Sequence, residues 1–517
     1  MPRARSQPST PRRARRAVLR GANQEQVGGV VLELRAKSQR QKADAYESTI
    51  GLLRAAAADP HLVAAAEAID ALTATDPSTG GRPRKYPTWA MELFKRSISI
   101  FGSASAAQRN LADPDLWTIV CREVAPNLPD GALLPPHAPN RSHYQYYARR
   151  LAPYSDALRA IFAELSARRA REVGLADPDT ARLARPDRMH VLGQDGKVFS
   201  SPVGTRATEV VDKVTGEARA PRRDPARGPH HEGGTSAIQW GTKVAFSSLR
   251  APEPGIRVIV DLQHVGHDKS DKRGEAGAFV DMTHRASAAL PGITHTVVDG
   301  AMRGVHIAEV QTRDGVLVVS PARRRQQARG GVKIEGTYHH AKQLPASKAR
   351  TREFANCAGH DLSAAGGIHE RIIAVDGTEA WSPVERGQIR RERKADGTYA
   401  FYADHTLPCH HTGEIHTWWE PLTPVAADEG AGFNRCEYLR ALPRDDDDYL
   451  RTYGMRADTE SFHAQLEYKF HKQRIPAYGA HRQLMVITGA AEVQNSWALY
   501  RFRQEHERQQ APPERAA

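Results

Sequence analysis

The sequence predicts an α/β protein with a helical region ahead of its sheet and a β-rich insertion within it. Residues 22–178 have the composition and periodicity of a succession of helices. Residues 188–321 then follow the order strand, strand, strand, helix, strand, helix, strand, which is typical of an α/β arrangement. The helical pattern disappears over residues 322–446 and returns over residues 447–505. We therefore expect one core of sheet and helices that the insertion splits in two, followed by a polar tail over residues 506–517.

Composition limits the class of protein. With 517 residues the chain is too long for one hydrophobic core and is expected to divide into two or three domains. Its 73 Lys and Arg residues outnumber 60 Asp and Glu residues, and the net charge of +13 points to nucleic acid first and an anionic membrane surface second. No apolar run is long enough to span a membrane, and no apolar stretch follows the N-terminal arginines as in a signal peptide. We expect a cytoplasmic, nucleoid-associated protein.

Basic residues are concentrated near the N-terminus. Residues 1–21 contain seven arginines and almost nothing to bury, which predicts a disordered basic tail that is attracted to phosphates. The segment Gly80–Pro87 then places Arg82, Arg84 and Lys85 between turn-forming residues, directly before a predicted helix. These three cations are the candidate DNA contacts of this region.

Three short helices follow the basic segment. The first begins at Thr88 or Trp89 and stops at Gly102, and the third has Asp113 as its N-cap and Pro114 at its first helical position. Short helices with basic flanks resemble a helix-turn-helix DNA-binding unit, and an ordinary small helical bundle is the alternative.

A longer helix is predicted over 140–175. Its first half interleaves aromatic and cationic side chains, namely Tyr144, Tyr146, Tyr147, Arg149 and Arg150. Such interleaving suits contacts to phosphates and bases, and aromatic packing in a helical core is the alternative.

The sheet region supplies two aspartates at strand ends. A first short strand carries Asp195, with Gly196 turning the chain. The segments 240–249 and 255–265 are two further strands, the second nearly all apolar as in a buried central strand. After a helix, another strand ends at Asp299.

The insertion is predicted to consist of strands. Two pairs of strands are joined through Asp-Gly turns at Asp376 and Asp396, and 434–442 is another predicted strand. Trp418 and Trp419 fall on opposite faces of one strand, so that one can be core while the other is exposed.

The segment Tyr453–Lys469 is a predicted amphipathic helix. Its apolar stripe consists of Met455, Thr459, Phe462, Leu466 and Phe470. Its polar stripe carries Tyr453, Arg456, Glu460 and Glu467. A solvated surface face is the ordinary explanation of such a stripe.

Three carboxylates form a candidate metal site. Asp195 and Asp299 lie at or near strand ends, and Glu460 lies on the late helix. Carboxylate oxygens from a sheet and a packing helix can converge on two Mg²⁺ ions, because hard divalent cations take oxygen ligands. Two such ions activate a water or a 3′-hydroxyl on one side of a phosphodiester and stabilise the leaving oxygen on the other.

The order of these elements resembles the DDE transposases of bacterial insertion sequences, whose catalytic domain has an RNase H-like fold. The late signature of that family is Tyr-x2-Arg-x3-Glu-x6-Lys, and Tyr453, Arg456 and Glu460 match its first three positions. The fourth position is Glu467, so the resemblance implies that Lys469 or Lys472 takes the place of the lysine. The family pattern also places the first Asp on the first strand beside a Gly, which favours Asp195 over the rival Asp261.

The resemblance implies a function. Asp195, Asp299 and Glu460 would be catalytic and would hold two Mg²⁺ ions, with Mn²⁺ as a substitute, while Tyr453, Arg456 and Lys469 would contact DNA. The partners would be double-stranded DNA at transposon ends and target, bound by a homodimer, with no membrane. The alternatives are an RNase H-like nuclease without strand transfer and a catalytically inactive, transposase-derived DNA-binding protein.

The four cysteines are too few and too scattered for a disulfide framework. Cys357 with His360, Cys409 with His411, and Cys436 are candidate zinc ligands in the insertion, although none makes a paired C-x-x-C motif.

Overall fold

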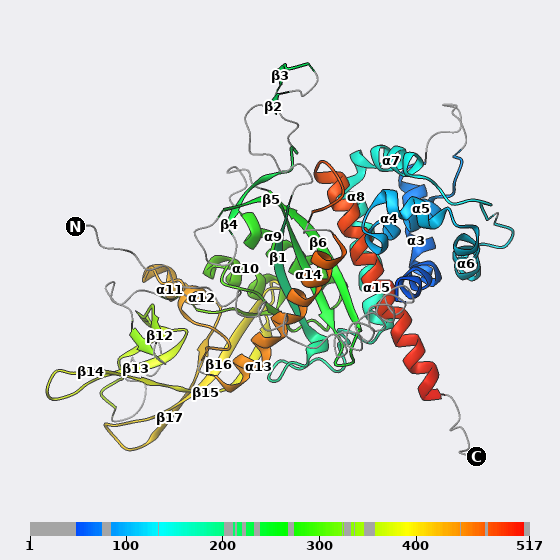
Figure 1. Cartoon of the computed structure of the whole chain (residues 1–517). Coiled ribbons are helices and arrows are strands. Elements are labelled where there is room, and N and C mark those ends of the chain that lie inside the picture. Colours follow the sequence, from blue (N-terminus) through cyan, green and yellow to red (C-terminus); the bar gives the residue numbers. More distant parts are fainter. Residues whose placement is uncertain are drawn as a thin grey trace, which may run out of the picture. The chain divides into compact units, whose positions relative to one another are not determined.

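The computed structural model describes most of the chain (Figure 1). The described residues are 48–74, 84–132, 134–200, 210–211, 215–219, 224–231, 238–266, 273–322, 324, 332–334, 337–345, 357–444, 446–470 and 474–510. The predicted basic tail over 1–21, Arg82, Lys472 and residues 511–517 of the predicted polar tail lie outside them.

In residues 48–190 the secondary structure that is described consists of helices joined by turns and loops. Beyond a first helix over 48–58 these are α3 (Pro60–Leu72), α4 (Thr88–Phe101), α5 (Ala104–Leu111), α6 (Pro114–Val124), α7 (Arg141–Arg150) and α8 (Ser155–Glu172), with short 3-10 turns between and after them. The start of α4 at Thr88 and its end at Gly102, which has a φ of +81°, are as predicted. Asp113 caps α6 as predicted, because its carboxylate accepts the N–H of Asp115.

The predicted long helix over 140–175 is wrong in one respect. It is interrupted by a 3-10 turn at Ala152–Tyr154 between α7 and α8. Pro153 explains the break, because proline cannot donate the backbone hydrogen bond that a continuous helix needs.

The central sheet is mixed and six-stranded. Its strands are β1 (Val191–Ser200), β4 (Gly228–His231), β5 (Ile238–Arg250), β6 (Arg257–Val265), β7 (His295–Val297) and β8 (Leu317–Val319). The order along the sheet is β5, β1, β7, β8, and both β6 and β4 pair with the other edge of β5. The pairs among β1, β5 and β6 are antiparallel, while β7 is parallel to β1 and β8 is parallel to β7. The helices α9 (Gly274–Ala289) and α10 (Gly304–Asp314) connect β6 to β7 and β7 to β8.

Gly196 does not turn the chain, contrary to the prediction. It lies inside β1, opposite Ala245 of β5. A Cβ atom at this position would lie 1.9 Å from Oε1 of Glu275 on α9. Glycine is therefore needed for close packing between the strand and α9 and not for a bend.

The insertion contains hairpins and two small sheets. Its strands are β9 (Val332–Ile334), β10 (Thr337–His339), β11 (Lys342–Gln343), β12 (Leu362–Ala365), β13 (Gly367–Ile373), β14 (Glu379–Pro383), β15 (Glu385–Arg393), β16 (Tyr399–Pro408) and β17 (Ile415–Pro421). One sheet has the order β11, β12, β13, β14 and the other the order β15, β16, β17. The hairpin turns at Asp376 and Asp396 are where they were predicted, since each carboxylate accepts the N–H of the Thr two residues later.

One predicted strand of the insertion is wrong. The segment 434–442 contains the short helix α12 (Arg435–Tyr438), which follows another short helix, α11 (Ala426–Gly430). The side chain of Asn434 caps α12 by accepting the N–H of Glu437. This local cap stabilises a helical turn, although the residue types of the segment favour a strand.

The C-terminal helices are α13 (Asp447–Tyr453), α14 (Ala457–Lys469) and α15 (Ala480–Gln510). The predicted single helix over Tyr453–Lys469 is broken by a 3-10 turn at Gly454–Arg456. Its apolar stripe is buried as predicted: Met455 is 8% exposed, and Thr459, Phe462, Leu466 and Phe470 are at most 1% exposed. No helix in the described part of the chain is long and apolar enough to cross a membrane.

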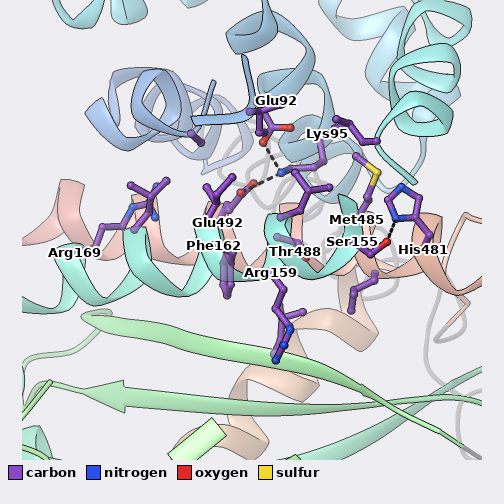
Figure 2. Close-up of a pocket in the computed structure, with 18 residues that line it drawn as sticks. Glu92, Lys95, Ser155, Arg159, Phe162, Arg169, His481, Met485, Thr488 and Glu492 are labelled. Carbon is purple, nitrogen blue, oxygen red and sulfur yellow. Dashed lines mark hydrogen bonds and ion pairs between the residues drawn. The ribbon is translucent and has the colours of Figure 1, made fainter. Parts of the chain in front are cut away.

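The helices before the sheet share a core with α15. Helix α4 packs along α15, and α8 packs on both α15 and β6 (Figure 1). At this interface Lys95 of α4 donates to Glu492 of α15 over 3.0 Å and is also paired with Glu92 (Figure 2). The residues around them enclose a cavity of about 40 Å³. Helices α4 and α8 are therefore part of the same folded unit as the sheet.

Candidate active site

The two faces of β1 meet different helices. Alternate side chains of a strand point to opposite faces, and Gly193, Asp195 and Lys197 share one of them. A Cβ atom on Gly193 would lie 2.7 Å from Oγ1 of Thr459, which places this face against α14. Gln194 on the other face donates to the carbonyl of Phe279 on α9 over 3.2 Å.

Asp195 is held by an arginine and a histidine from the segment that crosses this face. Its Oδ1 accepts from Nη2 of Arg456 at 3.3 Å, and its Oδ2 lies 3.4 Å from Nδ1 of His463. Burial alone would raise the pKa of Asp195, but the hydrogen bond and charge of His463, together with Arg456, lower it below its ordinary value. Asp195 is therefore ionised at neutral pH.

Asp299 lies at the same level of the sheet as Asp195. Gly193 of β1 pairs in parallel with Val297 of β7, and Asp195 and Asp299 each lie two positions beyond this pair. The Asp299 carboxylate accepts the N–H of Ala301 over 2.9 Å, which fixes it in the turn after β7. Asp195 and Asp299 also act on a common neighbour, because the charges of both raise the pKa of Arg456.

Glu460 completes the predicted set through the same arginine. Its Oε1 accepts from Nη1 of Arg456 at 2.5 Å, while half of the Glu460 side chain remains exposed. Arg456 thus bridges a carboxylate of the sheet and a carboxylate of α14. Burial lowers the pKa of this guanidinium, but Asp195, Glu460 and Asp299 outweigh it and raise the pKa.

A fourth carboxylate, Glu275, was missed by the sequence prediction. It lies in the first turn of α9 and forms an ion pair with Lys243 of β5 at 2.8 Å. Burial raises its pKa, and the negative charges of Asp299 and Asp195 add to the shift, while its contact with Gly196 places it on the face of β1 that α9 covers. The available signal was Gly196, the strand glycine that leaves room for Glu275.

The rival Asp261 lies on the other face of the sheet. Asp261 pairs with Ser247, which pairs with Gln194, so these three side chains share the face covered by α9. The Asp261 carboxylate is 1% exposed and accepts from Nε of Arg285 at 2.7 Å. Asp261 therefore forms a structural ion pair in the core.

The donor chemistry of the three predicted carboxylates fits a hard divalent cation. Asp195, Asp299 and Glu460 offer only oxygen atoms, as Mg²⁺ and Mn²⁺ prefer. In the described residues, the sets of donor atoms that lie within 4.8 Å of one another consist of Cys and His, so the carboxylates are spaced more widely. The guanidinium of Arg456 lies between two of them and supplies the positive charge that a bound ion would otherwise provide.

Beside the carboxylates lies a cavity of about 540 Å³ with basic walls. It begins at Gly300, directly after Asp299, and includes Tyr453, whose ring stacks on Tyr449 with 5.1 Å between centroids. Four arginines line it, namely Arg303, Arg324, Arg440 and Arg444, against a single acidic residue, Glu437. Such a wall suits a phosphate-bearing ligand.

Glu467, the position that departs from the transposase signature, forms an ion pair with Lys197 of β1. A lysine is thus present at this point of the site, but the strand provides it and the helix provides the carboxylate. Lys469 lies elsewhere: its backbone carbonyl is next to Gly102 at the end of α4, and burial lowers its pKa to about 8. Two positions along a helix correspond to roughly 200°, so Lys469 cannot share the face of Glu467.

The predicted N-terminal DNA contacts are described in part. Arg84 donates to Oγ1 of Thr73 at 2.9 Å and of Thr88 at 2.8 Å, and it is paired with Asp70. The Lys85 ammonium lies 5.7 Å from the centre of the Tyr86 ring. Together with Tyr146 and Arg150, among others, these residues line a cavity of about 510 Å³.

The aromatic residues of α7 and β17 divide between core and surface. Tyr144 and Tyr147 are buried, and the Tyr147 hydroxyl donates to Glu92 over 2.8 Å, whereas Tyr146 is 68% exposed. Trp418 is buried and Trp419 is 36% exposed, as their alternation predicted. The Trp419 ring stacks against Arg390, whose guanidinium carbon is 4.3 Å from the ring centre.

Comparison of the chain with models of known protein families gives no match, and comparison with curated proteins gives no significant match.

Proposed function

We propose that the chain is a transposase of the DDE type, with an RNase H-like core that cuts DNA at transposon ends and joins the freed 3′-hydroxyl to target DNA. The observation that carries the proposal is the gathering of Asp195, Asp299 and Glu460 around Arg456. The sheet supports the fold assignment, because three antiparallel strands are followed by two parallel strands that join on the other side of β1, as in an RNase H-like core.

In this proposal Asp195, Asp299 and Glu460 hold two Mg²⁺ ions, for which Mn²⁺ can substitute. When bound, the ions supply an activated water or 3′-hydroxyl and neutralise charge on the phosphate. His463 keeps Asp195 ionised and oriented through the contact at its Oδ2. Arg456 has the planar donor geometry that suits the terminal phosphate, and Tyr453 lies beside it at the edge of the basic cavity.

The proposed partner is double-stranded DNA. The basic cavity after Asp299 would follow the backbone of the transposon end, and the cations near Arg84 and Lys85 would contact phosphates further along the duplex. We propose that two copies act together, one on each end, because both ends have to reach one target. The cytoplasm, at the nucleoid, is where such an enzyme meets its DNA.

Glu460→Gln tests this function. The substitution keeps the size of the side chain and a hydrogen-bond acceptor for Arg456 but removes a metal-binding charge, so Mg²⁺-dependent strand cleavage is expected to disappear while binding to the ends persists. Duplexes that carry the DNA flanking the coding region serve as substrate, with cleavage followed on sequencing gels and binding by mobility shift. Normal cleavage by this variant would contradict the assignment of Glu460 as a metal-binding residue. Cleavage without 3′-end joining by the unmodified protein would identify a nuclease instead.

A second candidate, the inactive DNA-binding derivative, is favoured by Glu467 in place of the signature lysine. The ion pair between Lys197 and Glu467 argues against loss of the DNA contact expected of the signature lysine, because β1 provides a lysine at this point.

A charge swap tests whether Lys197 has that role. Lys197→Glu alone should weaken binding to a transposon end on the order of tenfold or more, since it removes a phosphate contact and places two carboxylates together. The double variant Lys197→Glu with Glu467→Lys restores the pair and the cation and is expected to recover most of that binding, measured by fluorescence anisotropy. If the double variant binds no better than Lys197→Glu alone, Lys197 does not take the place of the signature lysine in DNA binding.

A further inference from the structure

A second group of metal-ligating side chains lies in the insertion. Two thiols and two imidazoles are all buried there, and their ligand atoms lie within 4.8 Å of one another. They belong to Cys357, His360, Cys409 and His416. None of them takes part in the proposed cutting and joining of DNA.

The separations within the group are those of ligands around one ion. Sγ of Cys409 lies 3.7 Å from Sγ of Cys357, and Sγ of Cys357 lies 3.4 Å from Nε2 of His360. Tetrahedral zinc, with Zn–S of about 2.3 Å and Zn–N of about 2.0 Å, separates two sulfurs by about 3.8 Å and a sulfur from a nitrogen by about 3.5 Å. A disulfide would bring the sulfurs to about 2.05 Å.

An outer residue orients one of the imidazoles. Glu370 on β13, itself 4% exposed, lies with its Oε1 2.6 Å from Nδ1 of His360. With Nδ1–H donated to this carboxylate, Nε2 of His360 is left as an acceptor on the side of Cys357. Metal-ligating histidines in proteins are typically held by a carboxylate in this way.

The four ligands come from two sheets. Cys357 and His360 precede β12, while Cys409 follows β16 and His416 lies on β17. The turn between β16 and β17 is tight, because the N–H of Gly413 donates to the carbonyl of Cys409 over 2.8 Å and Gly413 has a φ of +76°. This turn brings Cys409 and His416 to the same end of their hairpin.

We infer that Cys357, His360, Cys409 and His416 form a structural Zn²⁺ site that fastens the sheet of β11–β14 to the sheet of β15–β17. Four protein ligands of the S₂N₂ type favour zinc, and their burial leaves no open position for substrate. The site is independent of the proposed catalysis.

The inferred ligand set differs from the one predicted from the sequence. Cys436 is excluded because it lies in the core beside α10, where its Sγ is 3.5 Å from Oε1 of Gln311. His411 is exposed and its Nε2 is bonded to the carbonyl of Gly359 at 3.2 Å, so His416 provides the fourth ligand in its place. The sequence separates Cys409 and His416 by six residues, which is longer than the usual spacing of a zinc hairpin.

Metal analysis of the full-length chain tests the site. The protein is purified without a histidine tag, under reducing conditions and from zinc-supplemented medium, and its metal content is measured by plasma mass spectrometry. About one zinc ion per chain is expected. Cys409→Ser and His416→Gln should each lower the zinc content several-fold, whereas Cys436→Ser, the matched buried cysteine outside the site, should keep it. The cobalt-loaded protein should show sulfur-to-cobalt charge-transfer absorption that Cys409→Ser weakens.

Three results would overturn the proposal. The first is folded wild-type protein that contains almost no zinc. The second is a disulfide between Cys357 and Cys409 in peptide mass maps of protein purified under reducing conditions. The third is a zinc content that stays unchanged in both ligand variants but falls in Asp195→Asn, which would assign the metal to the carboxylates. Because the first and second results and the cobalt spectrum use wild-type protein, the proposal stays open to refutation even if the ligand variants fail to fold.

Discussion

Asp195→Asn is expected to reduce Mg²⁺-dependent cleavage of transposon-end DNA by more than about a hundredfold, whereas Asp261→Asn should retain cleavage. Loss of a residue that only orients a metal ligand costs about ten- to a hundredfold, so loss of a ligand itself should cost more. Asp261 lies on the opposite face of the sheet, where it is paired with Arg285. Single-turnover cleavage at saturating protein measures both variants.

The two aspartates are matched controls for each other, since they lie on two strands of one sheet, β1 and β6, that both pair with β5. Asp261→Asn weakens a charged hydrogen bond in the core and should lower the free energy of unfolding by about 1.5–3 kcal/mol. Asp195→Asn should leave DNA binding intact. The opposite pattern, with cleavage lost in Asp261→Asn and kept in Asp195→Asn, would refute the assignment of the first carboxylate.

Asp59→Ala is expected to destabilise the protein by about 3–5 kcal/mol, because it removes the carboxylate paired with the buried Arg169 and one of the two carboxylates paired with the buried Arg96. Asp59 caps α3 and accepts from Nη2 of Arg169 at 2.6 Å, from Nη1 of Arg96 at 3.3 Å and from Oγ of Ser496 at 2.6 Å. Asp59, Arg96 and Arg169 are each at most 3% exposed. The midpoint of urea unfolding, followed by circular dichroism, measures the change.

Glu164→Gln is the control for Asp59→Ala. It breaks the ion pair with Arg168, in which both side chains are at least half exposed, and should change the stability by no more than about 1 kcal/mol. Equal effects of the two substitutions would contradict the account of the buried network.

The same network predicts how stability depends on pH. Burial opposes ionisation of Asp59, but Arg169 and Arg96 outweigh it and hold the pKa of this carboxyl well below its ordinary value. A depressed carboxyl pKa adds stability that is fully present above the unfolded pKa of about 4 and is lost as the pH falls from there through the folded pKa. The wild type should therefore lose stability below about pH 4 more steeply than Asp59→Ala.

Much of the sheet could be predicted because its strands differ clearly from their flanks in composition. The strands around Asp195, Asp261 and Asp299 and the helices between them lie where the hydrophobic patterns indicate. Periodicity alone also identified the buried stripe that ends at Phe470. The helix breaks at Ala152–Tyr154 and Gly454–Arg456 were harder to predict from the sequence, because one helical turn can change type without altering the hydrophobic period.

The contributions of Glu275, Lys197 and His416 could not be predicted, because each depends on pairing between distant segments. Glu275 packs against Gly196 on the face of β1 that α9 covers. Lys197 meets Glu467 only because β1 passes beneath α14, and His416 meets Cys357 only once two sheets of the insertion lie together. Contacts between residues far apart in the chain leave no local signal in a single sequence.

The pairing of Lys95 with Glu492 has a consequence for folding during synthesis on the ribosome. The two residues are 397 positions apart, so Lys95, which pairs with Glu92 inside α4, gains its second carboxylate partner only after nearly the whole chain has been made. At ordinary rates of synthesis that wait lasts roughly 20 to 80 s. During this time the first helices on the ribosome lack the helix that completes their core. A chain that stops before α15 therefore lacks the helix on which α4 and α8 pack.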